Sequence, residues 1–348
     1  MSADDDQQSD AGGPRVLVLG GTSWLGGAVA AHAVARGASV TCLARGRSGE
    51  VPPGMLLVEA DRDAGAEAYA AVIARAWDLV VDVARQPGHV RSALQALSDD
   101  AEHWAFVSSC SVYARHDEPG ADETAALLPA YDGDTAGPDR YGEAKVACEQ
   151  AVTAVRGDSA LVARAGLIVG RGDRSDRFGY WPGRFALAAE DGGPVLVPAD
   201  LERRVQWVDV RDLAAWLVDA GLAGATGTVN ATGPTTSLGH VLQEAAAVAG
   251  FGGETVAATD DRLRAADVEE FMGPRSLPLW LGDPEWQAFM DRDVSAARRI
   301  GLSCSPLRET MRSAVEHERA LGLDRPRTAA GLGRADELEV VGRVRDAR

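Results

Sequence analysis

Lysine is almost absent from this chain of 348 residues. Of its 35 basic residues only Lys145 is a lysine, and all the others are arginines. An ammonium group is a compact point charge whose pKa shifts readily, and a guanidinium does not replace it where such a charge is needed. The position of this lysine therefore carries information about function.

Cysteines are few and widely separated. The spacing of the four fits neither a disulfide framework nor a zinc site. We expect reduced, mostly structural thiols and no metal site. The four are Cys42, Cys110, Cys148 and Cys304.

Long apolar runs are missing, and so is an excess of positive charge. No stretch approaches the roughly 20 apolar residues of a membrane helix, and the acidic opening lacks the basic region of a secretory signal. We therefore expect a cytoplasmic protein with no membrane partner. The net charge of −17 disfavours nucleic acid, because binding to phosphates needs clustered Lys and Arg. Residues 1–13 are acidic without an apolar period, so we expect a disordered tail.

Apolar strand patterns alternate with helical patterns over the first half of the chain. A predicted strand at 15–19 leads through a glycine turn into an alanine-rich helix that ends at Gly37. Further strands and helices follow, including a predicted helix at 63–76. This alternation indicates an α/β protein with a Rossmann-type, doubly wound parallel sheet and right-handed crossovers.

The order of the predicted strands and helices along the chain predicts the domain organisation. Residues 14–175 form the dinucleotide-binding Rossmann domain, and later strands from about 205–235 return to it. Residues 176–204 and 236–325 form a smaller, mostly helical substrate-binding lid over the carboxyl ends of the strands. Residues 326–348 form a peripheral C-terminal segment.

The turn after the first strand has the composition of a pyrophosphate-binding turn. Its glycines let the backbone approach a pyrophosphate that faces the unpaired N–H groups of the next helix. A glycine turn alone also serves as a tight connection, but the place at the first strand–helix junction favours a dinucleotide. The predicted binding residues are Gly20, Thr22, Ser23, Trp24, Leu25 and Gly26.

The residues after the second strand indicate which dinucleotide is bound. An NAD site usually offers a carboxylate to the ribose hydroxyls, whereas this chain offers Arg45 and Arg47. Two arginines predict a 2′-phosphate, so NADP is the preferred cofactor and NAD the alternative. Exposed loop charges without a ligand would give the same sequence.

Tyr141 and Lys145 are four residues apart, so both project from one face of the predicted helix at 140–155. A phenol has a pKa near 10, and an adjacent ammonium lowers it by stabilising phenolate. The tyrosine can then act as general acid or base at a carbonyl or alcohol. With five tyrosines and one lysine, chance gives this spacing roughly once or twice in a hundred. We predict that both residues are catalytic.

In order and spacing these motifs resemble the extended short-chain dehydrogenase/reductase superfamily, over residues 15–322. The glycine turn resembles Gly-x-x-Gly-x-x-Gly with Ser23 in place of the middle glycine. Segments 164–171 and 205–212 resemble those of NAD-dependent epimerase/dehydratase-like proteins, and 176–181 resembles actinobacterial, isoflavone-reductase-like members.

The resemblance implies a third catalytic residue and further cofactor contacts. Residues 106–113 are similar to the Ser-Ser-x-x-Val-Tyr-Gly segment, which implies Ser109 as the catalytic hydroxyl. Ser111 stays a candidate because alternation along a strand puts both serines on one face, while Ser108 points away. Lys145 and Tyr141 would also contact the nicotinamide ribose. The adenosine would be contacted by Asp61, Arg62, Val83 and Ala84.

The substrate class is open from sequence. Leu167 stands where sugar-nucleotide enzymes commonly carry an asparagine, which disfavours a nucleotide sugar. Aromatic residues and arginines near 177–207 are typical of a pocket for an aromatic or apolar carbonyl compound, although lid core would have the same composition. The candidate substrate residues are Ser109, Ser111, Arg177, Phe178, Trp181 and Arg204.

The sequence therefore predicts an NAD(P)-dependent oxidoreductase that reduces a carbonyl-type small molecule by hydride transfer. One alternative is a nucleotide-sugar epimerase or dehydratase with tightly bound NAD, although the Asp-Glu pair of dehydratases is missing beside Ser109. Another is a non-catalytic nucleotide-sensing or RNA-binding member. The expected partners are a small-molecule substrate and, unless the protein is a monomer, a second copy in a homodimer through helix 140–155.

Overall fold

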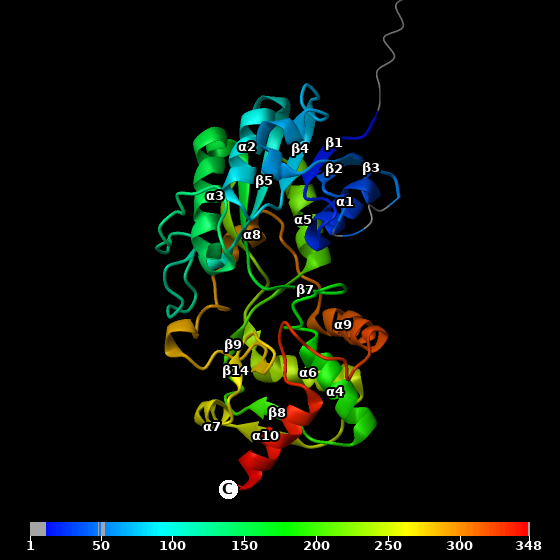
Figure 1. Ribbon diagram of the computed structural model, residues 1–348, viewed down its shortest axis with the longest axis vertical. Coiled ribbons are helices and arrows are strands. Elements are labelled where there is room, and N and C mark those ends of the chain that lie inside the picture. The colour runs from blue at the N-terminus through cyan, green and yellow to red at the C-terminus, as the bar shows by residue number, and fades with distance from the viewer. Residues whose placement is uncertain (1–11, 48, 50–52, 347–348) are drawn as a thin grey trace, which may run out of the picture.

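The computed structural model describes residues 12–47, 49 and 53–346 (Figure 1). Most of the predicted tail at 1–13 and the last two residues of the chain lie outside the described residues. A sheet with its helices occupies the upper half of Figure 1, and a second group of helices and short strands lies below it.

Seven parallel strands form the central sheet, in the order β11-β6-β5-β4-β1-β2-β3. The chain runs outward from β1 to β3 and then returns to β4 on the other side of β1, so the topological switch point lies between β1 and β4. This order confirms the predicted Rossmann-type, doubly wound fold. The strands are β1 (Arg15–Leu19), β2 (Ser39–Ala44), β3 (Met55–Glu59), β4 (Trp77–Asp82), β5 (Ala101–Ser109), β6 (Ala160–Ala165) and β11 (Gly227–Ala231).

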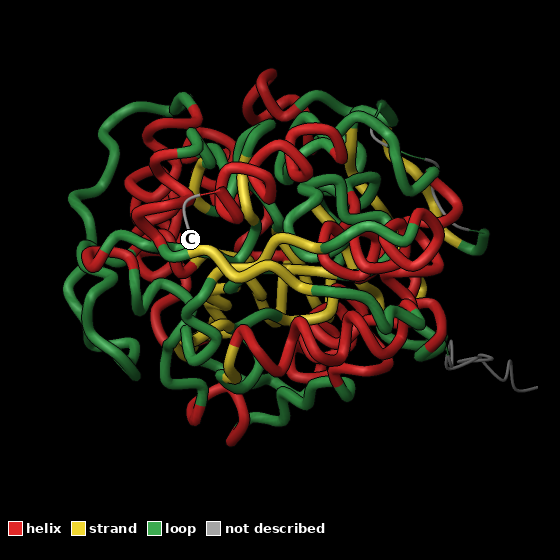
Figure 2. The backbone as a smooth tube through the Cα atoms, turned by 90° about the horizontal axis from the view of Figure 1, so that it is seen from below, coloured by secondary structure: helices red, strands yellow, loops and turns green. Residues whose placement is uncertain are grey.

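Helices cover both faces of this sheet (Figure 2). They are α1 (Trp24–Ala35), α2 (Pro87–Leu97), α3 (Tyr141–Arg156) and α5 (Val210–Leu222). Alternate residues of β1 point to opposite faces. Val16 and Val18 pack with α1 and α5, whereas Leu17 and Leu19 pack with α2 and α3. The inner strands of the sheet are buried on both faces, which explains why their sequences are largely apolar and do not alternate with polar residues.

The segment between β3 and β4 differs from the prediction. In place of an α-helix at 63–76, the chain forms the 3-10 helix η1 (Arg62–Tyr69). Gly65 interrupts it with a φ of +65°, a left-handed conformation that glycine adopts without steric cost. The other 3-10 turns are η2 (Ser98–Asp100), η3 (Cys110–Val112), η4 (Pro138–Arg140), η5 (Gly157–Ser159) and η6 (Pro284–Trp286).

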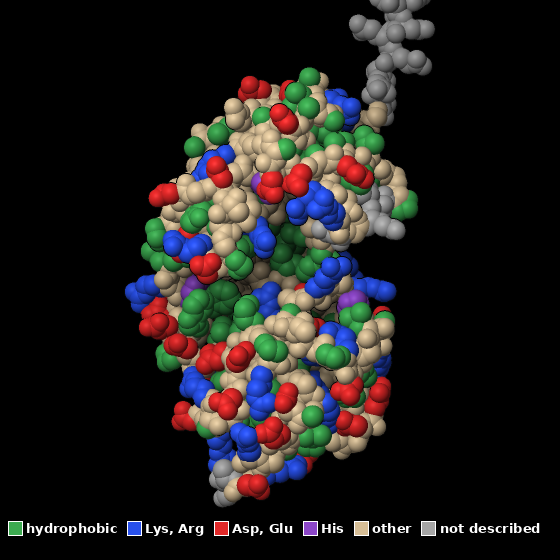
Figure 3. All heavy atoms as spheres, in the orientation of Figure 1, with side chains coloured by type: hydrophobic (Ala, Val, Ile, Leu, Met, Phe, Trp, Pro, Cys, Tyr) green, Lys and Arg blue, Asp and Glu red, His purple; other side chains and the backbone are tan. Residues whose placement is uncertain are grey.

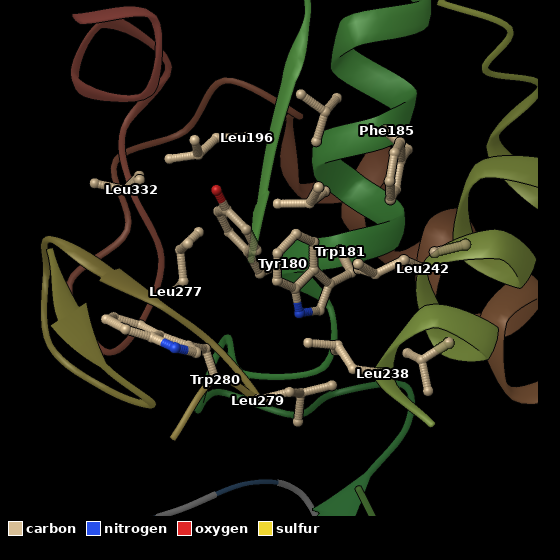
Figure 4. Close-up of a cluster of buried hydrophobic side chains, with 14 of the residues drawn as sticks. Tyr180, Trp181, Phe185, Leu196, Leu238, Leu242, Leu277, Leu279, Trp280 and Leu332 are labelled. Carbon is tan, nitrogen blue, oxygen red and sulfur yellow. The ribbon is translucent and has the colours of Figure 1, made fainter. Parts of the chain in front are cut away.

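The lower unit has its own hydrophobic core, centred on buried aromatic side chains of α4 (Figure 4). Its helices are α4 (Tyr180–Asp191), α6 (Leu238–Ala249), α7 (Asp260–Ala265), α9 (Leu307–Leu321) and α10 (Arg334–Asp346). Its strand pairs are β8 (Val195–Pro198) with β13 (Thr255–Ala258) and β14 (Glu269–Glu270) with β15 (Ser276–Leu277). The connections between the two units hold β7 (Ile168–Val169), β10 (Val208–Asp209), β9 (Arg204–Val205) and β12 (Thr236–Ser237). Helix α8 (Ser295–Arg299) returns to the upper unit, where Ala297 is buried in the core of the sheet.

The C-terminal segment is not peripheral, which corrects the expectation for 326–348 as far as residue 346. Val340, Val341 and Val344 of α10 are buried in the core of the lower unit. Glu337 is fully buried beside Arg184 and accepts a hydrogen bond from the backbone N–H of Leu196. The apolar residues at helical spacing pack α10 against this core. The ion pair between Glu337 and Arg184 adds a buried contact between α10 and α4.

Within the described residues, no helix is both long enough and apolar enough to cross a membrane.

Removing the buried apolar stripe of α10 should destabilise the protein. We expect Val340→Ala to lower the free energy of unfolding by about 2 kcal/mol, because two buried methyl groups are lost and a cavity remains. Leu338 lies on the same helix but is 42% exposed, so Leu338→Ala should change that energy by less than about 0.5 kcal/mol. Urea unfolding measures both. Equal effects of the two variants would show that α10 is peripheral.

Candidate active site

The glycine turn is built so that its backbone lies open to a ligand. Gly20 has a φ of +99°, and a Cβ there would come within 2.7 Å of Val83 Cγ2. A Cβ at Gly26 would overlap the carbonyl oxygen of Gly20, and one at Gly21 would overlap the side chain of Cys42. Each position therefore needs glycine for the chain to turn tightly from β1 into α1.

Ser23, which replaces the middle glycine, caps helix α1. Its hydroxyl donates to the carbonyl of Gly20 at 2.7 Å and accepts from the N–H of Gly26 at 3.1 Å. Serine is a favoured N-cap residue because it satisfies an N–H group left unpaired by the helix. The first turn of α1 has no acidic residue. The cradle therefore fits the pyrophosphate of a dinucleotide.

A cavity of about 400 Å³ extends from this turn along the ends of the strands. Leu25 and Gly26 are buried behind the turn, and Trp24 lines a different cavity described below. The cavity is therefore placed for the adenosine half of a dinucleotide. Of the predicted cofactor residues, those that line it are Gly20, Thr22, Ser23, Arg45, Asp61, Arg62, Val83 and Ala84.

The two arginines predicted to bind a 2′-phosphate are placed differently. Arg45 lines the cavity, half exposed, with its Nη1 3.9 Å from Asp61 Oδ2. Arg47 is exposed and does not line it. A phosphate near Arg45 would therefore approach a carboxylate as well, which opposes the attraction.

Arg62 supports the wall of this cavity from within. Its guanidinium forms a bidentate pair with Asp82, at 2.8 and 2.9 Å, and its Nε donates to Tyr69. Asp82 ends β4 and also accepts from the N–H of Ala84. Arg62 lines the nucleotide cavity, but its guanidinium is held in a buried ion pair, so its contact with adenine stays a prediction. Sequence analysis missed Asp82, whose only signal is a carboxylate at the end of an apolar strand.

The catalytic pair lies at the start of α3. Tyr141 is 36% exposed, whereas Lys145 is 3% exposed one turn later. The Nζ of Lys145 donates to the carbonyls of Ala84 and Val107, both at 2.6 Å, and lies 6.0 Å from the centre of the Tyr141 ring. The ammonium is thus fixed beneath the phenol, and it is bonded to the loop that lines the nucleotide cavity.

The two candidate serines lie together where β5 ends. Ser109 is its last residue, and its hydroxyl donates to the hydroxyl of Ser111 at 3.1 Å. Ser108 points to the other side and donates to the buried Glu149 of α3. A Cβ at Gly142 would overlap the carbonyl of Ser111, so glycine brings α3 against the serine turn. Both Ser109 and Ser111 are therefore placed beside Tyr141.

The serines and Tyr141 line a cavity of about 470 Å³ between the sheet and the lower unit. Figure 3 shows the surface hollowed at this waist. Leu167 contributes an apolar side chain, and Arg177 a guanidinium. The aromatic lining comes from distant parts of the chain, which no sequence motif brought together. It consists of Trp24, Phe271 and Phe289.

Three predicted substrate residues lie elsewhere. Phe178 and Trp181 are buried in the core of the lower unit. Figure 4 shows Trp181 among the side chains of this core, and its indole donates to the carbonyl of Pro278. Arg204 is exposed and pairs with Asp291 at a separate surface depression. The predictions for these three residues are corrected, because both aromatic side chains are buried in the lid core and Arg204 lies at another depression. Arg177 does line the cavity.

One buried thiol, that of Cys110, belongs to the lining of the substrate cavity. Cys110 follows Ser109, and its burial raises the thiol pKa to about 12. Its Sγ lies 3.3 Å from the carbonyl of Arg164, as a donor. In the described part of the chain, no group of three or more His, Cys, Asp or Glu side chains could hold a metal ion.

One family model matches the central part of the chain. Residues 93–230 match the NAD dependent epimerase/dehydratase family. The matched segment contains Ser109, Tyr141 and Lys145. A search of curated proteins gives no match.

Solved structures share the fold over most of their length. An epimerase candidate from Burkholderia cenocepacia J2315 has 25% identity and a TM-score of 0.66, over 88% of this chain and 98% of that one. The NAD-dependent NDP-hexosamine 5,6-dehydratase TunA, of tunicamycin biosynthesis, has 20% identity and a TM-score of 0.63, over 90% and 100%. UDP-glucuronic acid 4-epimerase from Bacillus cereus, in complex with NAD, has 14% identity and a TM-score of 0.62, over 88% and 97%. The fold is therefore shared with these epimerase and dehydratase structures, and a central segment of the chain matches the NAD dependent epimerase/dehydratase family.

Adjacent glycines of α1 provide a test of the cradle. We expect Gly26→Ala to weaken NADH binding at least ~10-fold, because its methyl group would displace the Gly20 carbonyl from the turn. A Cβ at Gly27 meets only the Gly21 carbonyl, at 3.6 Å, so Gly27→Ala should bind within about twofold of wild type. Calorimetric titration gives both affinities, and circular dichroism checks folding. If both folded variants bind NADH as wild type does, the cradle is not the cofactor site.

Proposed function

We propose that the protein is an NAD-dependent enzyme that transfers hydride between the nicotinamide and an alcohol or carbonyl carbon of a small molecule. The observation that carries the proposal is the position of Lys145, which is bonded to the nucleotide-cavity loop at Ala84 and lies beneath Tyr141 of the substrate cavity. The ammonium therefore joins the two cavities where a nicotinamide would meet a substrate.

The chain's own residues would hold the cofactor along the ends of the strands. The N–H groups at the start of α1 would bind the pyrophosphate, and Asp61 would accept from the adenosine. Lys145 has a third N–H besides the two used by carbonyls, and it is free to donate to the nicotinamide ribose. When bound, NAD supplies the hydride acceptor or donor.

Proton transfer would belong to Tyr141. Its Oη would exchange a proton with the substrate oxygen, while the ammonium of Lys145 stabilises the phenolate form. Ser109, or its neighbour Ser111, would donate to the same oxygen and hold the carbonyl in place. The apolar side chain of Leu167 and the indole of Trp24 would restrict water at this position.

The comparisons support an epimerase-type or dehydratase-type reaction best. For such a reaction, a tightly held NAD would supply both a hydride acceptor and a hydride donor within one turnover. Dehydration needs a further acid and base near the hydroxyl, yet Ser109 is followed by Cys110 and Ser111. Among the described residues, Asp173 is the carboxylate of the cavity lining, and it accepts from Ser175. An epimerase-type or simple redox reaction therefore fits better than dehydration.

A one-way reductase with exchangeable NADPH is the second candidate. What favours it is Arg45 at the adenosine end of the nucleotide cavity. The resemblance of 176–181 to isoflavone-reductase-like proteins points the same way. NAD is nonetheless the cofactor we propose, because Asp61 lies beside Arg45 and would repel a 2′-phosphate.

Replacing the catalytic phenol tests the reaction. We expect Tyr141→Phe to lower the rate of nicotinamide oxidation or reduction at least ~100-fold, because the proton donor is lost, while NADH affinity stays within about twofold. Tyr131 lies outside the cavity lining, so Tyr131→Phe should keep full activity. NADH absorbance is followed with UDP-glucose, UDP-glucuronic acid and aromatic 2-oxo acids as substrates. Turnover by Tyr141→Phe at the wild-type rate would refute the role of the phenol.

Cofactor choice is tested by titrating NADH and NADPH against Arg45→Ala and Arg47→Ala. We expect NADH to bind at least ~5-fold more tightly than NADPH, since the 2′-phosphate meets a carboxylate. Arg45→Ala should weaken NADPH further and leave NADH within about twofold, whereas Arg47→Ala should change neither. Tighter binding of NADPH, lost in Arg45→Ala, would instead select the reductase.

A further inference from the structure

A third cavity, of about 710 Å³, adjoins the substrate cavity at Tyr141. The two share Ser111, Tyr141, Phe271 and Phe289 in their linings. Figure 3 shows hydrophobic side chains gathered beside the waist, to its left. We call this cavity the aromatic groove. Its further apolar lining is Leu128, Met272, Leu281 and Trp286.

Two large apolar side chains that line the groove are exposed to solvent. Met272 is 54% exposed and Trp286 is 42% exposed. Phe271 has a φ of +65°, which is rare for a bulky residue and costs free energy. This backbone places its ring edge-on to Phe289, at 5.7 Å between centres. The ring of the strained Phe271 is itself buried, and it lies beside the exposed Trp286 in the groove lining. Strained backbone next to an exposed aromatic side chain is typical of a binding site.

The charges around the groove disfavour an anion inside it. His116 stacks on Trp286 at 4.6 Å, and its burial lowers its pKa to about 4, so the imidazole is neutral near pH 7. No Lys or Arg belongs to the described lining, which instead includes carboxylates at its rim. Glu143 and Glu270 pair with Arg140 and Arg264, which do not belong to the lining. The described lining itself therefore offers a diphosphate no cation. The carboxylates are Asp139, Glu143, Glu270 and Asp283.

Arg177 lies in the adjoining substrate cavity and has the opposite charge. In the described part of the chain its Nε is buried without a hydrogen-bond partner. Its guanidinium lies 5.1 Å from the centre of the Phe271 ring. The nearby Asp173 accepts from the N–H and hydroxyl of Ser175. A buried Nε–H without an acceptor costs free energy, although Asp173 is close enough to act on the charge of Arg177. A bound carboxylate would give that N–H an acceptor.

We propose that the substrate is an aromatic carbonyl or alcohol compound that carries a carboxylate, rather than a nucleotide sugar. Its ring would lie in the aromatic groove, its carboxylate would pair with Arg177, and its reacting oxygen would lie between Tyr141 and Ser109. The proposal rests on the proposed function.

Two fluorescent probes of similar shape test this arrangement. One is 1-anilinonaphthalene-8-sulfonate, an aromatic anion, and the other is the neutral N-phenyl-1-naphthylamine. We expect Arg177→Gln to weaken the anionic probe about 10-fold and leave the neutral probe within about twofold, because only the ion pair is lost. Arg177→Lys keeps the charge and should stay within about threefold of wild type for both probes.

The groove is tested with the same probes. Trp286→Ala should weaken both about 10-fold, because a large part of the aromatic surface is lost. The matched controls are Arg312→Gln and Leu321→Ala, both exposed positions on α9, and neither should change binding. Benzoylformate should displace the anionic probe, whereas UDP-glucose at the same concentration should not.

The proposal is overturned if UDP-glucose displaces the probe and benzoylformate does not. It is also overturned if Arg177→Gln and Trp286→Ala, folded by circular dichroism, bind both probes as wild type does. Probe binding needs no hydride transfer, so NADH is titrated separately in each variant. If the wild-type protein does not bind NADH, the proposed function is refuted. If NADH binds but the Arg177→Gln and Trp286→Ala variants bind both probes as the wild type does, only the substrate class is refuted.

Discussion

The active site depends on one buried charge. The ammonium of Lys145 lies between the carbonyls of Ala84 and Val107, so two hydrogen bonds offset part of the cost of burying it. These bonds tie α3 to the loop after β4 and to β5. Because Tyr141 begins α3 and Ser109 ends β5, the same ammonium fixes the distance between the phenol and the serine. A planar guanidinium does not match this compact position, which explains why a chain biased toward arginine keeps a lysine here.

A second buried network holds α3 from its other end. Glu149 forms a bidentate pair with Arg164 of β6, and Arg164 also donates to the phenol of Tyr113. Ser108 donates to the same carboxylate. Adjacent residues at the end of β5 therefore have different roles. Ser108 contacts Glu149 and helps to hold α3, whereas Ser109 faces the substrate cavity. Breaking this buried pair would shift α3, and the catalytic pair would move with it.

Much of the catalytic centre could be predicted from sequence, because its determinants are local. The turn from Gly20 to Gly26 and the spacing of Tyr141 and Lys145 follow from one strand–helix junction and one helix. The predictions that are wrong concern side chains whose positions depend on residues far along the chain. Trp181 was predicted to line the substrate pocket but is buried in the core of the lower unit. The pairing of Arg62 with Asp82 also depends on a residue far along the chain, and no local pattern predicted it.

The same reason explains what was missed in the lower unit. Phe271 and Phe289 reach the active site through loops whose path no periodicity describes. Val340 and Val344 of α10 do show helical spacing, but many charged residues surround them in the sequence. Residues 326–348 were therefore predicted to be peripheral. Burial of α10 depends on Glu337 finding Arg184, a pairing between segments far apart in the chain.

The central claim is that the nucleotide cavity and the cavity at Tyr141 are two ends of one cofactor site, joined at Lys145. A crystal structure of the protein with NAD bound tests this most directly. The account predicts that the pyrophosphate lies on the N–H groups of the glycine turn and that Lys145 donates to the nicotinamide ribose, with Tyr141 beside the nicotinamide ring. A nicotinamide bound away from Tyr141, with Lys145 still bonded only to its two carbonyls, would contradict it.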